Sequence, residues 1–303
     1  MISVVIPNYK RKDSLVNSIS SVCNQTYKDL IEIIVVDDHS PNFHEIEEAV
    51  SCLHLPSNVS LKFLRHEENK YASAARNTGI LNCKGDYLAL LDSDDCWKTD
   101  YLQSQLSYYT ENKPVTGEDF VLFGVCNNVL DEGGWMQPVR GISPNEKVEE
   151  YIFLHKQCCQ TSTLFSSVNT FRRNLFDESL KALQDPSFAI NAVHNGYEMR
   201  FNPNAVVMRY LSWDENNDHV GRKLDPDFLK AWLKKHQSKM SPLGIDAFSL
   251  RYFSKNKIKI IVKYFFKRNS IKILKLGCKE ITKSKLGCIY NSNLIKKLRV
   301  LFK

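Results

Sequence analysis

Three carboxylates follow an apolar run in the first third of the chain. The segment Tyr87-Leu-Ala-Leu-Leu91 leads directly into Asp92, Asp94 and Asp95. Such groups repel one another unless a cation or hydrogen-bond donors neutralise them, and Mg²⁺ and Mn²⁺ prefer oxygen ligands. The pattern therefore predicts a metal site that would hold the phosphates of a substrate. The alternative is an acidic turn that caps a helix starting near Lys98.

A second acidic pair stands in the same kind of place. Asp37 and Asp38 follow the apolar run Ile31-Glu-Ile-Ile-Val-Val36. Parallel strands bring their carboxyl ends to one edge of a sheet, and ligands of open α/β folds bind at that edge. We therefore expect Asp37 and Asp38 to lie beside the cluster at Asp92.

The elements that must position these acids alternate along the chain. Apolar runs predict strands at 2–6, 31–36, 87–91 and 120–125, and alternating apolar and polar residues predict a strand at 59–65. Helices are predicted at 15–22, 43–50 and 71–83. Strand and helix alternating in units of about thirty residues indicate a doubly wound, mostly parallel α/β sheet.

The second half of the chain is less regular. We expect a loop at 128–144, helices at 148–156, 168–176, 184–195 and 225–240, strands at 199–201 and 205–210, and a polar loop at 211–224. These patterns divide the chain into an α/β half (1–127), a second half of the same domain (128–249) and a tail (250–303).

The tail differs in charge from the rest of the protein. Residues 251–303 carry 16 Lys and Arg against one acid, Glu280, whereas the whole chain carries only +7. On a helix, one face would carry Ile258, Ile261, Val262, Phe265 and Phe266. A basic amphipathic segment is typical of binding to an anionic membrane surface. A helical cap on the body is the alternative, and the absence of any nucleic-acid motif argues against nucleic acid as a partner.

Composition limits the class and the compartment. The 303 residues, 43% of them hydrophobic, suffice for one large domain, alone or with an appendage. No apolar run is long enough to span a bilayer, and Met1-Ile-Ser-Val-Val-Ile-Pro7 lacks the basic region of a signal peptide. The nine cysteines form no C-x-x-C pair. We therefore expect a cytoplasmic protein with free thiols.

Taken together, four blocks resemble glycosyltransferase family 2 in order and spacing. They are Ser3-Val-Val-Ile-Pro-Asn-Tyr9, Glu32-Ile-Ile-Val-Val-Asp-Asp-His-Ser40, Ala74-Ala-Arg-Asn-Thr-Gly-Ile80 and Gly85-Asp-Tyr-Leu-Ala-Leu-Leu-Asp-Ser-Asp-Asp-Cys-Trp97. The resemblance implies the GT-A fold, in which a nucleotide-sugar-binding sheet is followed by an acceptor-binding half. It also implies an inverting, metal-dependent enzyme that moves a hexose from a nucleotide donor, with UDP expected, to a glycan hydroxyl.

The resemblance assigns the edge after the first strand to the nucleotide. Pro7, Asn8 and Tyr9 would lie beside the base, where Pro7 fixes the backbone, Asn8 offers hydrogen bonds and Tyr9 lies against the ring. Asp38 would accept a hydrogen bond from the base. Asp37 is expected to brace the turn.

The diphosphate is assigned to the next two blocks. Arg76 would contact the base or the pyrophosphate with its guanidinium donors, unless it only forms a salt bridge to Asp37 or Asp92. In the family's D-x-D motif, here Asp92-Ser93-Asp94, Asp92 would face the ribose of the donor and also bind the metal, and Ser93 would face the donor. Asp94 would hold Mn²⁺ or Mg²⁺ against the diphosphate.

A fifth block, Phe176 to Asp185, resembles the part of the family that contains the catalytic acid. It implies that Asp185 is the base that takes the proton from the acceptor hydroxyl, by the logic of an inverting glycosidase. The alternative is that Asp185 only N-caps a helix. Pro186 departs from the family pattern and puts the local geometry in question.

The resemblance extends to two further metal candidates. Asp95 would bind the metal through water or position the loop, and His219 would complete the metal shell or touch the diphosphate. Trp213, in the same polar loop as His219, would cover the sugar or belong to the core.

The expected acceptor is a lipid-linked oligosaccharide at the inner membrane face, as in O-antigen or capsule assembly, with lipid A core as the next choice. Two other functions compete. A sugar-phosphate nucleotidyltransferase would carry a Gly-rich loop after its first strand, but Pro7-Asn-Tyr-Lys-Arg11 contains no glycine. An inactive sugar-nucleotide-binding module would not need the acids at Asp92, Asp94 and Asp185.

Overall fold

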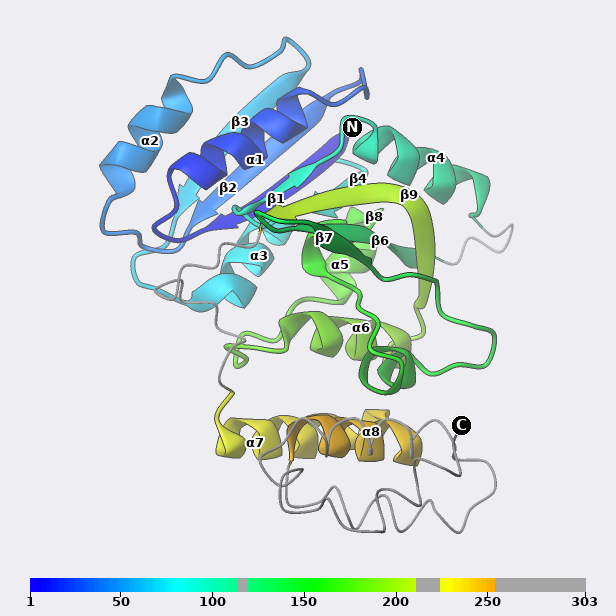
Figure 1. The fold of residues 1–303 in the computed structure, drawn as a ribbon. Helices are drawn as coiled ribbons and strands as arrows, with labels where there is room; N and C mark the ends of the chain where they lie inside the picture. Colours follow the sequence, from blue (N-terminus) through cyan, green and yellow to red (C-terminus); the bar gives the residue numbers. More distant parts are fainter. Residues whose placement is uncertain (114–118, 211–223, 254–303) are drawn as a thin grey trace. The chain divides into compact units, whose positions relative to one another are not determined.

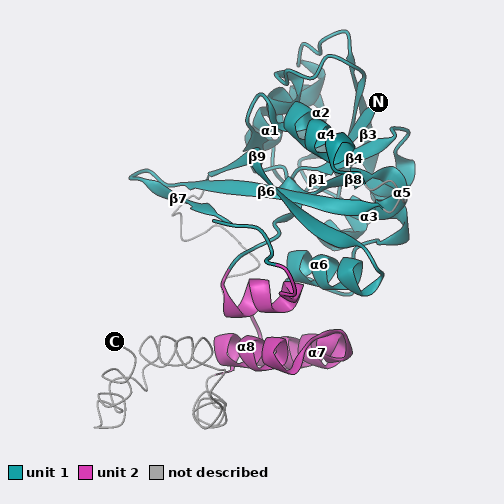
Figure 2. Cartoon of the chain, turned by 90° about the vertical axis from the view of Figure 1, so that its right-hand side faces the viewer, with its two compact units in different colours: residues 1–143, 157–222 teal, residues 144–156, 223–303 magenta. Residues whose placement is uncertain are grey.

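The computed structural model of the protein describes residues 1–113, 119–210 and 224–253. It forms two compact units, 1–143 with 157–222 and 144–156 with 223–303 (Figure 2). Strands from both predicted halves, 1–127 and 128–249, share one sheet, and the division into these halves and a tail stays a prediction. Among the described residues, no helix combines the length and the apolar character needed to cross a membrane.

A nine-stranded sheet organises the first unit, in the order β3-β2-β1-β4-β8-β6-β9-β5 with β7 beside β6 (Figure 1). The parallel part contains β1 (Ile2–Asn8), β2 (Ile31–Asp37), β3 (Val59–Arg65) and β4 (Tyr87–Leu90). In the mixed part, β8 (Phe165–Ser167) runs antiparallel to β4 and to β6 (Phe120–Val129), and β9 (Glu198–Tyr210) runs parallel to β6. The edge strands β5 (Asp95–Trp97) and β7 (Gly134–Gln137) are antiparallel to β9 and β6. The predicted α/β class is confirmed.

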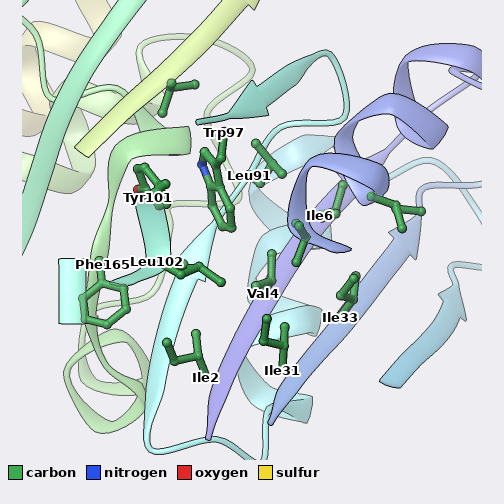
Figure 3. Packing of buried hydrophobic residues seen from close by; sticks show 14 of the residues in the cluster. Ile2, Val4, Ile6, Ile31, Ile33, Leu91, Trp97, Tyr101, Leu102 and Phe165 are labelled. Atoms are coloured by element: carbon green, nitrogen blue, oxygen red, sulfur yellow. The ribbon is translucent and has the colours of Figure 1, made fainter. Parts of the chain in front are cut away.

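Helices cover both faces of this sheet. They are α1 (Asp13–Cys23), α2 (Phe43–Ser51), α3 (Tyr71–Asn82), α4 (Tyr101–Glu111), α5 (Val168–Arg173) and α6 (Gln184–His194). Apolar residues of α1, α2 and α4 share one core with Ile2, Val4 and Ile6 of β1 (Figure 3). On the other face, α3 lies so close to β1 that a Cβ at Gly79 would collide with the Val5 side chain. The sheet is therefore fixed from both sides, and its carboxyl edge is a rigid support.

Several predictions of local structure were wrong. The expected loop at 128–144 contains β7, which pairs with the end of β6 beyond a turn in which Gly133 has φ +83°. The two strands expected at 199–201 and 205–210 are the single strand β9, whose register with β6 shifts opposite Gly124. Pro203 lies within that irregularity, which is one of the few places where a strand accepts proline.

The second unit is built around aromatic side chains. It contains a π-helical turn (Glu150–Leu154), α7 (Pro226–His236), a 3₁₀ turn (Gln237–Lys239) and α8 (Pro242–Tyr252). The rings of Trp232 and Phe248 stack with centroids 4.6 Å apart, and Phe153 meets Phe248 edge to face at 5.1 Å. Most of the basic tail, from residue 254, lies outside the described residues, as do Trp213 and His219.

Candidate active site

The acidic segments meet at the carboxyl edge of the parallel strands, as predicted. β1 lies between β2 and β4, with Asn8 opposite Asp37 and the Leu91 N–H donating to the carbonyl oxygen of Val5. A carboxylate oxygen from each of Asp92, Asp94 and Asp95 lies within 4.8 Å of the others.

The alternative that these acids cap a helix is wrong. α4 begins at Tyr101, after the short strand β5, and its N-cap residue is Asp100. Asp95 opens β5 instead. Its Oδ2 accepts hydrogen bonds from the Ser162 hydroxyl at 2.6 Å and from Gln160 Nε2 at 3.1 Å. Asp95 is thus tied to the short turn that precedes β8.

Burial distinguishes Asp95 from its neighbours. Asp95 is only 3% exposed to solvent, whereas Asp92 and Asp94 are partly exposed. Burial, with the negative charge of Asp94, raises the pKa of Asp95, and Arg209 opposes this effect. Asp92 and Asp94 are therefore the better-placed ligands, and Asp95 supports the loop that carries them. Direct binding of metal by Asp95 stays a prediction.

Arg76 connects the acidic cluster to α6. From α3, its Nη2 donates to Asp92 Oδ1 at 2.6 Å and its Nη1 donates to Gln184 Oε1 at 2.6 Å. Burial alone lowers the pKa of Arg76, but the carboxylate of Asp92 raises it above its ordinary value. The salt bridge to Asp92, which the sequence left as an alternative, is present. In the part of the chain that the structure describes, the buried Nε of Arg76 has no hydrogen-bond partner.

Asp185 lies in the first turn of α6, directly after Gln184. The alternative that it N-caps this helix is wrong, because Leu183 occupies the N-cap position. The Thr161 hydroxyl donates to Asp185 Oδ1. Burial raises the pKa of Asp185, while Thr161 and Arg76 partly offset the rise. Pro186 also falls in the first turn, where a missing N–H costs no helical hydrogen bond.

The block that contains Arg76 also anchors the segment before α6. Asn77 Nδ2 donates to the carbonyl oxygen of Phe176 at 2.9 Å and to Glu178 Oε1 at 2.8 Å, and the Phe176 N–H donates to Asn77 Oδ1 at 2.9 Å. Adjacent residues of α3 therefore position both the Arg76 guanidinium and the segment that leads to Asp185.

At the other end of the edge, Asp37 braces the turn after β2. Its carboxylate accepts hydrogen bonds from the Ser40 N–H at 2.8 Å, from the Ser40 hydroxyl at 2.6 Å and from Asn8 Nδ2 at 3.3 Å. Asp38 Oδ1 accepts from the Lys70 N–H at 2.8 Å and lies 2.7 Å from His66 Nδ1. A contact between Asp38 and a base stays a prediction.

Some polar atoms along this edge are buried without a partner. Asn8 Oδ1 and the Ser93 hydroxyl are two of them. Tyr9, which follows β1 and Pro7, is 40% exposed. An exposed ring beside unsatisfied polar atoms is suited to a flat, polar ligand such as a nucleotide base.

Two cations of the site carried no signal in the sequence. Arg11, after β1, pairs with Asp94 through Nη2 and Oδ2 at 2.9 Å. Arg209, on β9, lies 3.5 Å from Asp95 through Nε and Oδ1. Both belong to segments without a matching block, so only tertiary structure brings them to the acids.

The residues present fit a divalent cation. Carboxylate oxygens of Asp92, Asp94 and Asp95 lie close together. The two partly exposed acids each pair with an arginine through one oxygen, Asp92 with Arg76 and Asp94 with Arg11. Hard ions such as Mg²⁺ and Mn²⁺ take one or two carboxylates and leave positions for water and phosphate. Asp92 and Asp94 would supply those carboxylates.

Comparisons with known proteins identify the family. Residues 3–180 match the protein family Glycosyl transferase family 2. The amylovoran biosynthesis glycosyltransferase AmsB of Erwinia amylovora is 29% identical over 198 residues, which are 65% of each chain. An uncharacterised glycosyltransferase of Rickettsia conorii, RC0461, is 31% identical over 188 residues, 61% of this chain but only 28% of that protein. The chain therefore spans less than two thirds of these relatives.

Solved structures agree on the fold. The S. aureus TarS fragment 1–349 in complex with UDP-GlcNAc superposes with a TM-score of 0.64 over 92% of this chain and 79% of that one, at 17% identity. Its complex with UDP gives a TM-score of 0.61 at 16% identity. The GT-A-like fold expected from the sequence is confirmed. With more than half of its length matched, from β1 to the segment before α6, the chain belongs to glycosyl transferase family 2.

Proposed function

We propose that this protein is an inverting, metal-dependent glycosyltransferase that moves a hexose from a UDP-linked donor to a glycan hydroxyl. One observation carries the proposal. Arg76 hydrogen-bonds both Asp92 of the acidic cluster and Gln184, the residue before Asp185. The proposed diphosphate anchor and the proposed base are thus held at one site.

Each residue has a role that its surroundings support. Asp92 and Asp94 would hold Mn²⁺ or Mg²⁺, which supplies Lewis-acid stabilisation to the departing diphosphate. Arg76, fixed by Asp92 and Gln184, places positive charge beside that group. Asp185 accepts the proton of the acceptor hydroxyl as the new bond forms, and its raised pKa makes it a stronger base than an exposed aspartate.

The competing functions have less support. Nucleotidyltransfer would need a Gly-rich loop after β1, where Pro7-Asn-Tyr-Lys-Arg11 stands. An inactive binding module would not need a buried, basic carboxylate at Asp185 beside the acidic cluster. Family membership favours transfer over both.

A panel of nucleotide sugars tests the donor. We expect UDP-hexoses, with Mn²⁺ present, to raise the unfolding temperature of the protein, because a ligand that binds only the folded state stabilises it. ADP- and GDP-linked sugars are the matched controls. Equal stabilisation by all three nucleotides, or the same effect in excess EDTA, would contradict the assignment of a UDP donor held through metal.

The proposed acceptor is a lipid-linked oligosaccharide at the inner membrane face. The names of relatives such as AmsB support polysaccharide assembly, and the 16 Lys and Arg in residues 251–303 support a membrane surface. Deleting 257–303 is expected to release the protein from vesicles that contain phosphatidylserine. Flotation assays measure this, with neutral vesicles and raised salt as controls. Unchanged binding to the anionic vesicles would assign the tail a structural role instead.

A further inference from the structure

A row of four side chains crosses four strands beside the acidic cluster. Asp95 of β5 is the register partner of Arg209 of β9, Arg209 is the partner of Asn128 of β6, and Asn128 is the partner of Trp135 of β7. Residues directly opposite one another on paired strands project from the same face of a sheet. One face therefore presents a carboxylate, a guanidinium, an amide and an indole in that order, over about 14 Å at the usual strand spacing.

Contacts along the row hold it together. Arg209 Nε lies 3.5 Å from Asp95 Oδ1, and Arg209 Nη1 donates to Asn128 Oδ1 at 3.4 Å. Asn128 Nδ2 donates in turn to the carbonyl oxygen of Trp135 at 3.2 Å. Asn128 is only 4% exposed, and its amide connects the Arg209 guanidinium to the backbone of β7, with a further contact from Nδ2 to the carbonyl oxygen of Cys126 at 3.5 Å. It is a positioning residue.

Two members of the row, Arg209 and Trp135, remain accessible. The Arg209 side chain is 35% exposed, and Trp135 is 48% exposed. Figure 2 shows β7 and the end of β6 extending as a hairpin from the sheet. An indole there gains little from the hydrophobic core, so packing within this unit does not account for it.

The row also leads toward the proposed base. Burial lowers the pKa of the Arg209 guanidinium, but the charges of Asp95, Asp185 and Asp92 contribute to raising it overall. Arg209 therefore lies within electrostatic reach of both the acidic cluster and Asp185. A ligand that touched Arg209 and Trp135 would extend outward from the place where a hydroxyl would react.

We propose that Arg209 and Trp135 form an acceptor subsite, in which one sugar ring of the glycan acceptor stacks on the Trp135 indole and hydrogen-bonds the Arg209 guanidinium. The chemistry fits because a pyranose has an apolar C–H face for an aromatic ring and hydroxyls for charged donors. This inference rests on the proposed glycosyl transfer and adds where the acceptor lies.

Met136 supplies a matched control. It is the next residue on β7 and is 50% exposed. Met136 pairs with Asn127 of β6, which in turn pairs with Met208 of β9, so Met136 projects from the opposite face of the sheet. A sugar bound along the row would contact Trp135 and not Met136. A hairpin that instead dipped into lipid would use both exposed side chains.

The test uses the full chain with diamagnetic Mg²⁺ and UDP, and methyl glycosides of glucose, galactose and N-acetylglucosamine as probes. NMR saturation transfer measures their contact with the protein. We expect at least one glycoside to be saturated at its ring C–H protons. Trp135→Ala should lower that signal about fivefold or more, the size of one aromatic contact, while Trp135→Phe and Met136→Ala keep most of it.

The outcomes separate this proposal from the proposed function. Calorimetry of UDP with Mg²⁺ on the same samples reports the donor site, so failure of the unmodified protein to bind UDP would count against the proposed function itself. With UDP bound, a sugar signal that is missing, or that Trp135→Ala leaves unchanged, overturns the acceptor subsite. Equal loss of anionic-vesicle binding in Trp135→Ala and Met136→Ala, with no change in sugar contact, would overturn it in favour of a lipid contact.

Discussion

Replacing Asp185 by asparagine is expected to lower the rate of sugar transfer by about 10²- to 10⁴-fold, the usual contribution of a general base. The amide keeps the size of the side chain and can still bond to the Thr161 hydroxyl, but it cannot take a proton. UDP binding with Mn²⁺ should persist, because Asp92 and Arg76 keep their contact. Transfer kinetics and calorimetry on the same preparation check both parts.

The pH profile gives a second readout for Asp185. Transfer requires the ionised carboxylate, and burial raises its pKa. The rate should therefore fall as the pH is lowered through a value above the ordinary aspartate pKa of about 3.9. The residual activity of the Asp185→Asn variant should not show this fall at low pH.

Asp177→Asn is the matched control, since Asp177 precedes the same helix but bonds to Ser179. Full activity in Asp185→Asn, or an equal loss in Asp177→Asn, would move the base to another residue of this block. Glu178, which accepts from Asn77, would then be the next candidate.

Replacing Asp94 by alanine is expected to weaken UDP binding in the presence of Mn²⁺ by at least about 100-fold and to abolish transfer. The estimate is a lower bound, because losing even residues that support metal ligands costs 10- to 100-fold. The substitution also frees Arg11 from its ion pair at 2.9 Å. Titration of Mn²⁺ and UDP by calorimetry measures the change.

Asp100→Asn is the control for charge, because Asp100 is an exposed acid just before α4 and its side chain does not cap that helix. The Mn²⁺-dependent affinity of this variant should equal that of the unmodified protein. If Asp94→Ala bound UDP normally and kept its dependence on Mn²⁺, the metal would have to be assigned to Asp92 and Asp95 alone.

Much of the parallel half could be predicted because its signals are local. The runs at β1 and β2 are apolar and rich in β-branched residues, β3 alternates between apolar and polar residues, and β4 is apolar, so the sequence alone identifies these strands within a residue or two. Right-handed βαβ connections then leave few topologies, and these place Asp37 and Asp92 on either side of β1.

The mixed half was harder because its order depends on long-range pairing. Nothing in residues 165–167 indicates that β8 lies between β4 and β6. Gly133 and Pro203 each suggest the end of a strand, but Gly133 lies in the turn of a hairpin and Pro203 lies in a bulge within β9. A segment of three residues is too short to show a strand periodicity, so its pairing with neighbouring strands decides whether it forms a strand.

For the site, the sequence by itself determined the acids, Arg76 and the block that ends in Asp185, because these are fixed residue types at fixed spacing. Only the tertiary structure decided how they meet. It joined Arg76 to Gln184, set Asp95 inward against Ser162, and brought Arg209 from β9 to the cluster. The physical reason is that a contact between residues 67 or 108 positions apart depends on packing, which no local pattern records.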